Sequence, residues 1–226
     1  MPKTVAVLPI KSFGRAKQRL AERVGAPQRA TLAAAMVGDV LEALGAVRGL
    51  DEILVVTTEP RAVEAARAAG LRVIDDPTEA GHSEAALLGV DAAVQGGAER
   101  VLLVPGDCPA LDPAEVDALL ERDAARAAGV APRVVIVSDR HGSGTNALLL
   151  TPPAVMPPSF GRGSLARHAG MASGAGADVR VAGLRSLQLD VDTPGDLAAL
   201  RAALGGLPGA APRTRALLAQ LVQAAA

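Results

Sequence analysis

Short apolar runs alternate with longer amphipathic segments through the first half of the chain. The apolar runs are rich in Val, Ile and Leu and end at Gly, Pro or polar residues, which is typical of buried strands. The amphipathic segments repeat their apolar residues every three or four positions, as helices packed on one face do. The predicted strands are 4–9, 52–57, 71–74 and 101–104, and the predicted helices are 28–44, 60–69, 83–95 and about 113–128.

The second half of the chain is less regular. Its predicted strands are 133–138, 146–151, 178–182 and 187–191, and its predicted helices begin at Ser164, at Thr193-Pro194 and near residue 213. Ser83 and Ser164 are the predicted N-caps of their helices. The order of elements predicts an α/β fold with a mostly parallel central sheet flanked by helices. No internal repeat or long linker divides the chain, so residues 1–226 are expected to form a single domain, with the last helix, about 213–225, packed outside it or against a partner.

The apolar run 101–104 leads directly into Pro105-Gly106-Asp107. A run buried on both faces is predicted to lie at the centre of a parallel sheet, and such a sheet places its ligand at the carboxyl ends of its strands. Gly106 lets the backbone approach a ligand closely, and the Asp107 carboxylate suits a metal–phosphate group. Asp107 is therefore a candidate site residue.

Asp190 and Asp192 lie at the end of the predicted strand 187–191. Alternation along a strand would place both carboxylates on the same side, with Val191 facing away. Together with Asp107 they could hold Mg²⁺, which prefers a few carboxylates plus phosphate oxygens and water. The alternative is structural: Asp192 would cap a helix and Asp107 would form a turn.

A basic loop follows the first strand and contains Lys11, Arg15, Lys17 and Arg19. Cations at this position could neutralise a nucleotide triphosphate and then the leaving diphosphate. The spacing is not specific, and an ordinary solvated loop has the same composition.

Two glycine-rich segments are candidates for binding a small anion. Gly142-Ser143-Gly144-Thr145 joins two predicted strands, and its alternative reading is a hairpin loop. Gly161-Arg162-Gly163-Ser164 opens a predicted helix, and its alternative reading is a plain N-cap. A protein with both sites could bind a second phosphate- or carboxylate-bearing substrate beside a nucleotide.

The composition excludes several classes of protein. With 2 Phe, no Tyr, no Trp and a net charge of −1, the chain has neither stacking rings nor a basic field for nucleic acid or a membrane. The first apolar run is too short for a signal peptide or a membrane span, so a cytoplasmic location is expected. One Cys excludes an internal disulfide, and Cys108 is interpreted as a packing residue. Neither a P-loop nor a GxGxxG motif follows the first strand.

Five motifs occur in order along the chain: VLPIKSFGRAKQRLA, VPGDCPAL, DRHGSGTNALLL, FGRGSLARH and LDVDTPGDL. Together they resemble the guanylyltransferases of coenzyme F(420) biosynthesis, which use 2-phospho-L-lactate or phosphoenolpyruvate. The resemblance extends from about Val5 to Leu197 and implies the Rossmann-like nucleotidyltransferase fold.

The resemblance also implies a role for each candidate residue. Thr145, Gly161 and Ser164 match the phosphoenolpyruvate-binding positions, and Asp107, Asp190 and Asp192 match the metal-binding aspartates. Lys11 and Lys17 lie in the stretch similar to the one that meets the GTP phosphates, and Gly106 is a further predicted nucleotide-binding residue. Family members often carry an Asn near the base, whereas this chain has Gly81-His82-Ser83-Glu84, so Glu84 is predicted to bind guanine instead.

The implied reaction is a Mg²⁺-assisted transfer of GMP from GTP to phosphoenolpyruvate or 2-phospho-L-lactate, with release of diphosphate. Phosphoenolpyruvate is preferred because of Thr145, Gly161 and Ser164, and a homodimer is one assembly left open. Two alternatives remain. One is a related nucleotidyltransferase, or a glycosyltransferase, that acts on another acceptor, and the other is a non-catalytic nucleotide-binding homologue.

Overall fold

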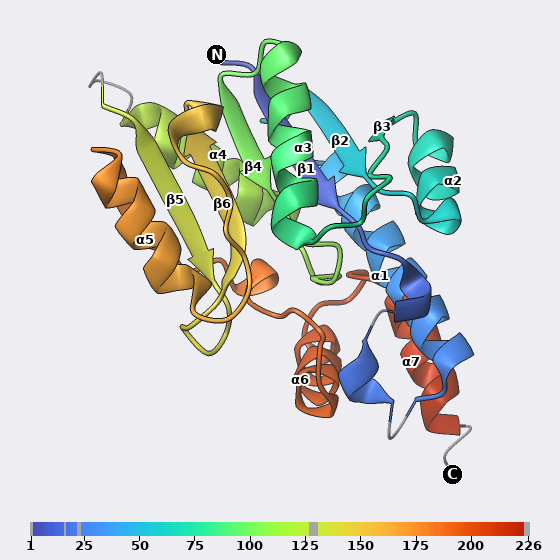
Figure 1. Ribbon diagram of the computed structural model, residues 1–226. Helices are drawn as coiled ribbons and strands as arrows, with labels where there is room; N and C mark the ends of the chain where they lie inside the picture. The colour runs from blue at the N-terminus through green and yellow to red at the C-terminus, as the bar shows by residue number, and fades with distance from the viewer. Residues whose placement is uncertain (1, 16, 22–23, 127–130, 224–226) are drawn as a thin grey trace.

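The computed structural model describes residues 2–15, 17–21, 24–126 and 131–223. Within them, one seven-stranded sheet has the order β3-β2-β1-β4-β6-β5-β7 (Figure 1). The strands are β1 (Thr4–Pro9), β2 (Glu52–Val56), β3 (Arg72–Ile74), β4 (Arg100–Leu103), β5 (Arg133–Ser138), β6 (Thr145–Thr151) and β7 (Asp178–Ala182). Neighbouring strands are parallel except at β6, which runs antiparallel to both β4 and β5. The predicted α/β class with a mostly parallel sheet is therefore confirmed.

Helices cover both faces of this sheet, because successive strand residues point to opposite sides. One face packs against α1, α2 and α4, and the other packs against α3 and α5 (Figure 1). In β1, Ala6 and Leu8 belong to the first layer, whereas Val5 and Val7 belong to the second. The helices are α1 (Ala26–Gly45), α2 (Pro60–Ala68), α3 (His82–Gln95), α4 (Pro113–Ala125), α5 (Ser164–Gly174), α6 (Pro194–Gly205) and α7 (Pro212–Gln223).

A third apolar cluster joins α1, α6 and α7 to the loops that follow β1 and β4. It buries Leu20 from the first loop, Ala110 from the second, and Val191 from the segment before α6. In the sequence, Leu20 follows Lys17 by three residues and Ala110 follows Asp107 by three residues. Val191 lies between Asp190 and Asp192. Apolar burial in this cluster therefore holds together the three segments that carry the candidate site.

The last helix, α7, packs against α1. The Asp39 carboxylate of α1 accepts hydrogen bonds from the backbone N–H groups of Arg213 (3.1 Å) and Thr214 (2.8 Å) in the first turn of α7. The negative charge stabilises this helix N-terminus. Residues 224 and 225 of the predicted helix, and 127 and 128 of the predicted fourth helix, lie outside the described residues.

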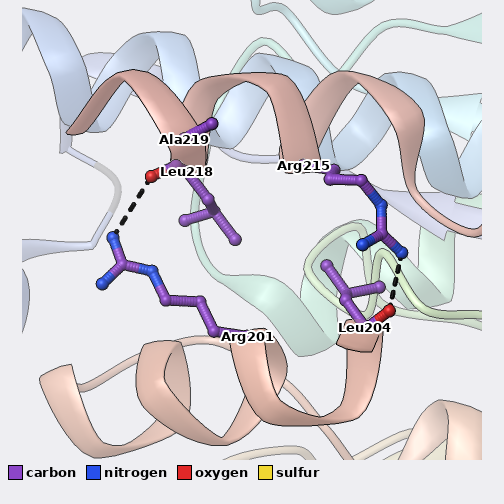
Figure 2. A pocket seen from close by; sticks show the side chains of 5 residues that line it. All are labelled: Arg201, Leu204, Arg215, Leu218 and Ala219. Atoms are coloured by element: carbon purple, nitrogen blue, oxygen red, sulfur yellow. Dashed lines mark hydrogen bonds between the residues drawn. The ribbon is translucent and has the colours of Figure 1, made fainter. Parts of the chain in front are cut away.

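A cavity of about 220 Å³ separates α6 from α7 and is lined by Arg201, Leu204, Arg215, Leu218 and Ala219 (Figure 2). Its two arginines point across the gap. The Arg215 guanidinium donates to the Leu204 carbonyl at 2.8 Å, and Arg201 donates to the Leu218 carbonyl at 3.5 Å. Both arginines thus satisfy carbonyl groups of the opposite helix, and the cavity is part of the packing between α6 and α7.

The predicted strand 187–191 is wrong. Arg185–Leu187 form a short 3₁₀ helix, and residues 188–193 have no regular structure. The backbone bonds elsewhere: the Val191 N–H donates to the Asp107 carbonyl at 3.2 Å, and the Leu187 carbonyl accepts from the Asn146 side chain at 2.8 Å. The strand alternation proposed for Asp190 and Asp192 is therefore absent.

The two predicted serine N-caps are also wrong. The N-caps of α3 and α5 are Gly81 and Gly163, neither of which has a side chain to cap with. Ser83 and Ser164 lie in the first turns of these helices, and their hydroxyls accept hydrogen bonds from distant backbone N–H groups instead. Thr193 does cap α6 as predicted, with Pro194 as the first helical residue.

In the part of the chain that the structure describes, no helix is both long and apolar enough to cross a membrane.

Because α3 packs closely against the sheet at Gly89, we expect a larger side chain at this position to destabilise the protein. A Cβ atom there would overlap with Val7 Cγ1 and would lie 2.9 Å from Val56 Cγ2. We expect Gly89→Ala to lower the free energy of unfolding by about 1–3 kcal/mol, measured by urea denaturation. The control is Gly170→Ala in α5, where a Cβ would meet no atom within 4 Å. Alanine should raise stability there by roughly 0.5–1 kcal/mol, and equal losses at the two positions would contradict the packing argument.

Candidate active site

A buried lysine links two of the predicted aspartates. Lys17 Nζ donates to Asp107 Oδ2 at 2.5 Å and to Asp192 Oδ1 at 3.1 Å, and its side chain is 7% exposed. Lys17 lies in the loop after β1, Asp107 follows β4, and Asp192 precedes α6. The structure thus brings three distant segments together at the carboxyl end of the central strands, where a doubly wound sheet binds its ligand.

The charge of Lys17 is stabilised by its partners. Burial lowers the pKa of the Lys17 ammonium, but the negative charges of Asp107 and Asp192 and their hydrogen bonds outweigh this and raise the pKa above its usual value. Lys17 therefore remains protonated at neutral pH. Its backbone is left-handed (φ 56°), a conformation that costs a non-glycine residue roughly 1–2 kcal/mol. The ion pairs and the buried neighbour Leu20 hold it there.

Asp190 lies beside the lysine cluster but has a different partner. Its carboxylate accepts a hydrogen bond from Asn146 Nδ2 at 3.2 Å, and the same amide group donates to the Leu187 carbonyl at 2.8 Å. Burial raises the pKa of Asp190, and the negative charges of Asp107 and Asp192 raise it further, against the effect of Asn146. The three carboxylates are thus close enough to repel one another.

The donor set fits a divalent cation in its chemistry and its charge. Three carboxylates and one ammonium leave two negative charges, and carboxylate oxygens are the ligands that Mg²⁺ prefers. Among the described residues, however, no three His, Cys, Asp or Glu side chains are already gathered where one metal ion could bind. Lys17 occupies the space between Asp107 and Asp192, and Asn146 holds Asp190. The metal site predicted from the sequence stays a prediction.

Cys108 is a structural neighbour of this cluster. It is fully buried, its thiol donates to the Leu187 carbonyl at 3.4 Å, and burial raises the pKa of the thiol well above its ordinary value. A protonated, hydrogen-bonded thiol is a poor nucleophile. This agrees with the interpretation of Cys108 as a packing residue.

The other predicted nucleotide-binding residues surround the cluster without joining it. Lys11 is exposed just after β1, and the side chain of Arg15 lies outside the described residues. At Gly106 a Cβ would lie 3.1 Å from Val37 Cγ2, so the tight packing of α1 favours glycine there. Glu84 is exposed in the first turn of α3, with its carboxylate folded against Gly81, where the positive end of the helix dipole stabilises it.

The three residues predicted to bind the acceptor lie together. The Thr145 backbone N–H donates to Ser164 Oγ at 2.8 Å, and the Ser164 N–H donates to the Gly161 carbonyl at 3.1 Å. Gly142, Ser143 and Gly144 lie in the hairpin loop between β5 and β6, as the alternative reading proposed, and Thr145 is the first residue of β6. Gly161 and Gly163 have φ values of 106° and 70°, which only glycine adopts readily.

The helix N-terminus beside these residues is less open than the sequence suggested. The Ser164 N–H bonds to the Gly161 carbonyl, and the Leu165 N–H bonds to the Ser143 carbonyl at 3.3 Å. These two amides are therefore not available to an anion in this conformation. The hydroxyl groups of Thr145 and Ser164 remain as the donors that this site offers.

Sequence reasoning missed Asp196, which holds the segment that carries Asp192. Its carboxylate accepts hydrogen bonds from the backbone N–H groups of Asp192 (3.1 Å) and Thr193 (2.7 Å) and from the Thr193 hydroxyl (2.8 Å). Arg140, from the β5–β6 loop, forms an ion pair with it at 2.6 Å. Burial raises the pKa of Asp196, but these hydrogen bonds and Arg140 lower it below its usual value. The Thr-x-x-Asp capping-box spacing was a signal for this residue.

The sheet order, the helices on both faces and the acidic and basic groups at the strand ends are typical of an α/β protein that binds a nucleotide. A family model described as "Guanylyl transferase CofC like" matches residues 4–206. The chain belongs to this family.

Named relatives agree with this assignment. A phosphoenolpyruvate guanylyltransferase from Conexibacter woesei is 48% identical over 221 residues, covering 97% of each chain. One of the same name from Sphaerobacter thermophilus is 38% identical over 194 residues, covering 86% of this chain and 90% of its own.

Solved structures share the fold at low identity. A Desulfovibrio desulfuricans protein assigned as a nucleotide-diphospho-sugar transferase superposes with a TM-score of 0.76 at 19% identity, covering 99% of this chain and 98% of its own. Glucosyl-3-phosphoglycerate synthase from Mycobacterium tuberculosis, solved with Mn²⁺, uridine diphosphate and glucosyl-3-phosphoglycerate, gives a TM-score of 0.57 at 14% identity, with coverages of 98% and 79%.

The hydrogen bonds to Asp196 predict that its loss will destabilise the protein. We expect Asp196→Ala to lower the free energy of unfolding by about 2 kcal/mol, because it removes a helix cap and leaves Arg140 without its partner. Denaturant unfolding measures the change. Asp112→Ala, which removes a cap with a single bond to Ala114 N–H, should cost about 1 kcal/mol. Asp91→Ala on the exposed face of α3 should change stability by no more than about 0.5 kcal/mol. An Asp196 effect no larger than that of Asp91 would contradict the proposed role.

Proposed function

We propose that this protein transfers GMP from GTP to the phosphate group of phosphoenolpyruvate and releases diphosphate. The observation that carries the proposal is the buried Lys17–Asp107–Asp192 cluster, together with the linked residues Thr145 and Ser164. Asn146, which follows Thr145 in β6, joins the two regions by donating a hydrogen bond to Asp190. A relative that is 48% identical along almost the whole chain is named for this reaction, which supports the choice of base and acceptor. The product would serve coenzyme F(420) biosynthesis, and 2-phospho-L-lactate is the alternative acceptor.

The reaction is a single in-line displacement at phosphorus. A phosphate oxygen of the acceptor attacks the α-phosphorus of GTP, and a new P–O bond forms there. The bond from the α-phosphorus to the bridging oxygen of the β-phosphate breaks, and diphosphate leaves with that electron pair. No covalent enzyme intermediate is needed, because positioning and charge neutralisation can supply most of the rate enhancement.

The residues of the chain divide the work between the two substrates. The ammonium groups of Lys11 and Lys17 would neutralise the GTP phosphates and the charge that develops on the leaving diphosphate. Thr145 and Ser164 would donate their hydroxyl hydrogens to the acceptor, with Gly161 allowing its close approach. Mg²⁺, when bound by Asp107, Asp190 and Asp192, would supply further neutralisation of the phosphate charge.

A substrate panel tests the reaction. The protein is incubated with Mg²⁺, one of GTP, ATP or CTP, and one of phosphoenolpyruvate, 2-phospho-L-lactate or 3-phosphoglycerate, and the products are identified by mass spectrometry. We expect diphosphate release and a guanylylated phosphoenolpyruvate product, both lost when EDTA removes the metal. Asp107→Asn should lower kcat/KM by roughly 100-fold or more, because it removes one charge from the cluster.

The matched control for Asp107→Asn is Asp91→Asn, since Asp91 is an exposed aspartate on the outer side of α3. This variant should retain the activity of the unsubstituted protein. The proposal would be overturned by the absence of GMP transfer to any of the acids, or by a product formed only with another nucleotide or acid. GMP transfer that survives EDTA and Asp107→Asn unchanged would reject the roles of the metal and of Asp107.

Glu84 is proposed to read the guanine base by accepting hydrogen bonds from its N1–H and exocyclic amine. Its exposed position at the start of α3 leaves the carboxylate accessible to a ligand. We expect Glu84→Gln to reduce the preference for GTP over ATP, measured as a ratio of kcat/KM values, by roughly 10-fold or more. The control is Glu64→Gln, an exposed glutamate on α2. An unchanged GTP to ATP ratio in Glu84→Gln would remove Glu84 from the base site.

A further inference from the structure

His168 lies completely buried in α5, next to the proposed acceptor site. Both ring nitrogens have partners: Nδ1 lies 2.9 Å from Thr145 Oγ1, and Nε2 accepts the backbone N–H of Ser159 at 2.8 Å. The ring also contacts Phe160 edge-on, with centroids 5.3 Å apart. Neither the resemblance nor the predicted site assigns a role to this histidine.

The hydrogen bond from Ser159 fixes the tautomer of the imidazole. A backbone N–H can only donate, so Nε2 must offer a lone pair. A neutral imidazole carries one proton, which must then lie on Nδ1 and be donated to Thr145 Oγ1. Burial, together with the nearby Arg167 guanidinium, lowers the pKa of His168 to about 4, so the ring is neutral at physiological pH.

This tautomer determines what the Thr145 hydroxyl can do. Because Oγ1 already accepts the Nδ1 proton, its own hydrogen must point away from His168. Within the described residues, that hydrogen has no acceptor. A phosphate or carboxylate oxygen can only accept hydrogen bonds, so a hydroxyl held as a donor is matched to an anionic acceptor and binds it more strongly than a neutral one.

His168 also holds the other side of the same site. Ser159 and Phe160 directly precede Gly161, and the Arg167 guanidinium binds both of their carbonyls, at 2.8 and 3.1 Å. The Phe160 N–H in turn donates to Ser83 Oγ of α3 at 2.9 Å. One buried ring thus connects Thr145 on β6 with the backbone that leads to Gly161.

We infer that His168 is a positioning residue that orients the Thr145 hydroxyl as a hydrogen-bond donor to the phosphorylated acid. The inference rests on the proposed function for the identity of that ligand. A purely structural histidine would hold the 159–163 loop in place but would have no specific effect on acceptor affinity.

Two substitutions separate these roles, because each preserves one half of the ring's hydrogen bonding. The asparagine amide nitrogen in His168→Asn can replace Nδ1 as donor to Thr145, and the glutamine amide oxygen in His168→Gln can replace Nε2 as acceptor from Ser159. We expect His168→Gln to raise the KM for phosphoenolpyruvate about 10-fold or more, and His168→Asn to change it by less than about threefold. The KM for GTP should stay within about twofold in both variants.

A double-mutant cycle supplies the control. In a Thr145→Val background the hydroxyl is absent, so adding His168→Gln should produce no further rise in the KM for phosphoenolpyruvate. Equal effects of the Asn and Gln variants, or a His168→Gln effect that persists undiminished beside Thr145→Val, would assign His168 to loop stability and overturn the inference.

The tautomer itself can be measured in the unsubstituted protein, without relying on the folding of any variant. Ring ¹⁵N chemical shifts of His168 at neutral pH should show the proton on Nδ1, and a proton on Nε2 would overturn the inference. Failure of the proposed function would be different: no GMP transfer to any of the three acids, with His168 still protonated on Nδ1. Normal transfer with the proton on Nε2 would reject the role of His168 alone.

Discussion

The structure of the site depends on the burial of one charged group, the ammonium of Lys17. Removing an ammonium from water costs several kcal/mol unless paired charges and hydrogen bonds compensate for it. Asp107 and Asp192 supply this compensation from segments far apart in sequence. The ion cluster can therefore form only when the loop after β1, the end of β4 and the segment before α6 have met. Apolar burial of Leu20, Ala110 and Val191 brings these segments together, so the charged site rests on a hydrophobic one.

The hydrophobic pattern predicted the fold well because each strand and helix had a local signal. The parallel core strands are continuous apolar runs, and the helices on both faces repeat at helical spacing. The segment 187–191 misled this reasoning because Leu187, Leu189 and Val191 imitate strand alternation. Its backbone instead bonds to Asp107 and to the Asn146 side chain. Those partners come from other parts of the chain, so no local pattern could reveal them.

The same limit explains which site residues the sequence could indicate. Asp107, Thr145 and Ser164 lie at the ends of strands and helices, where ligand-binding residues are expected. The structure brings Thr145 and Ser164 into hydrogen-bonding contact. Serine is a common N-cap residue, yet the Ser83 and Ser164 hydroxyls accept hydrogen bonds from the backbone N–H groups of Phe160 and Thr145, which are distant in sequence. Asn146 reads as an ordinary strand residue, and only its bond to Asp190 shows its place in the site.

The two halves of the site are stabilised by different physical means, and this matches what each half is proposed to bind. On the nucleotide side, like charges are held together by one lysine, so the arrangement is poised to change when phosphates and a cation arrive. On the acceptor side, His168, Thr145 and Ser164 are neutral, buried and joined by hydrogen bonds with little freedom to rearrange. Asn146 connects the two, since it follows Thr145 in β6 and its side chain donates a hydrogen bond to Asp190. A rigid acceptor site beside an electrostatically adjustable phosphate site suits an in-line transfer, because the attacking oxygen must be fixed while charge moves along the nucleotide.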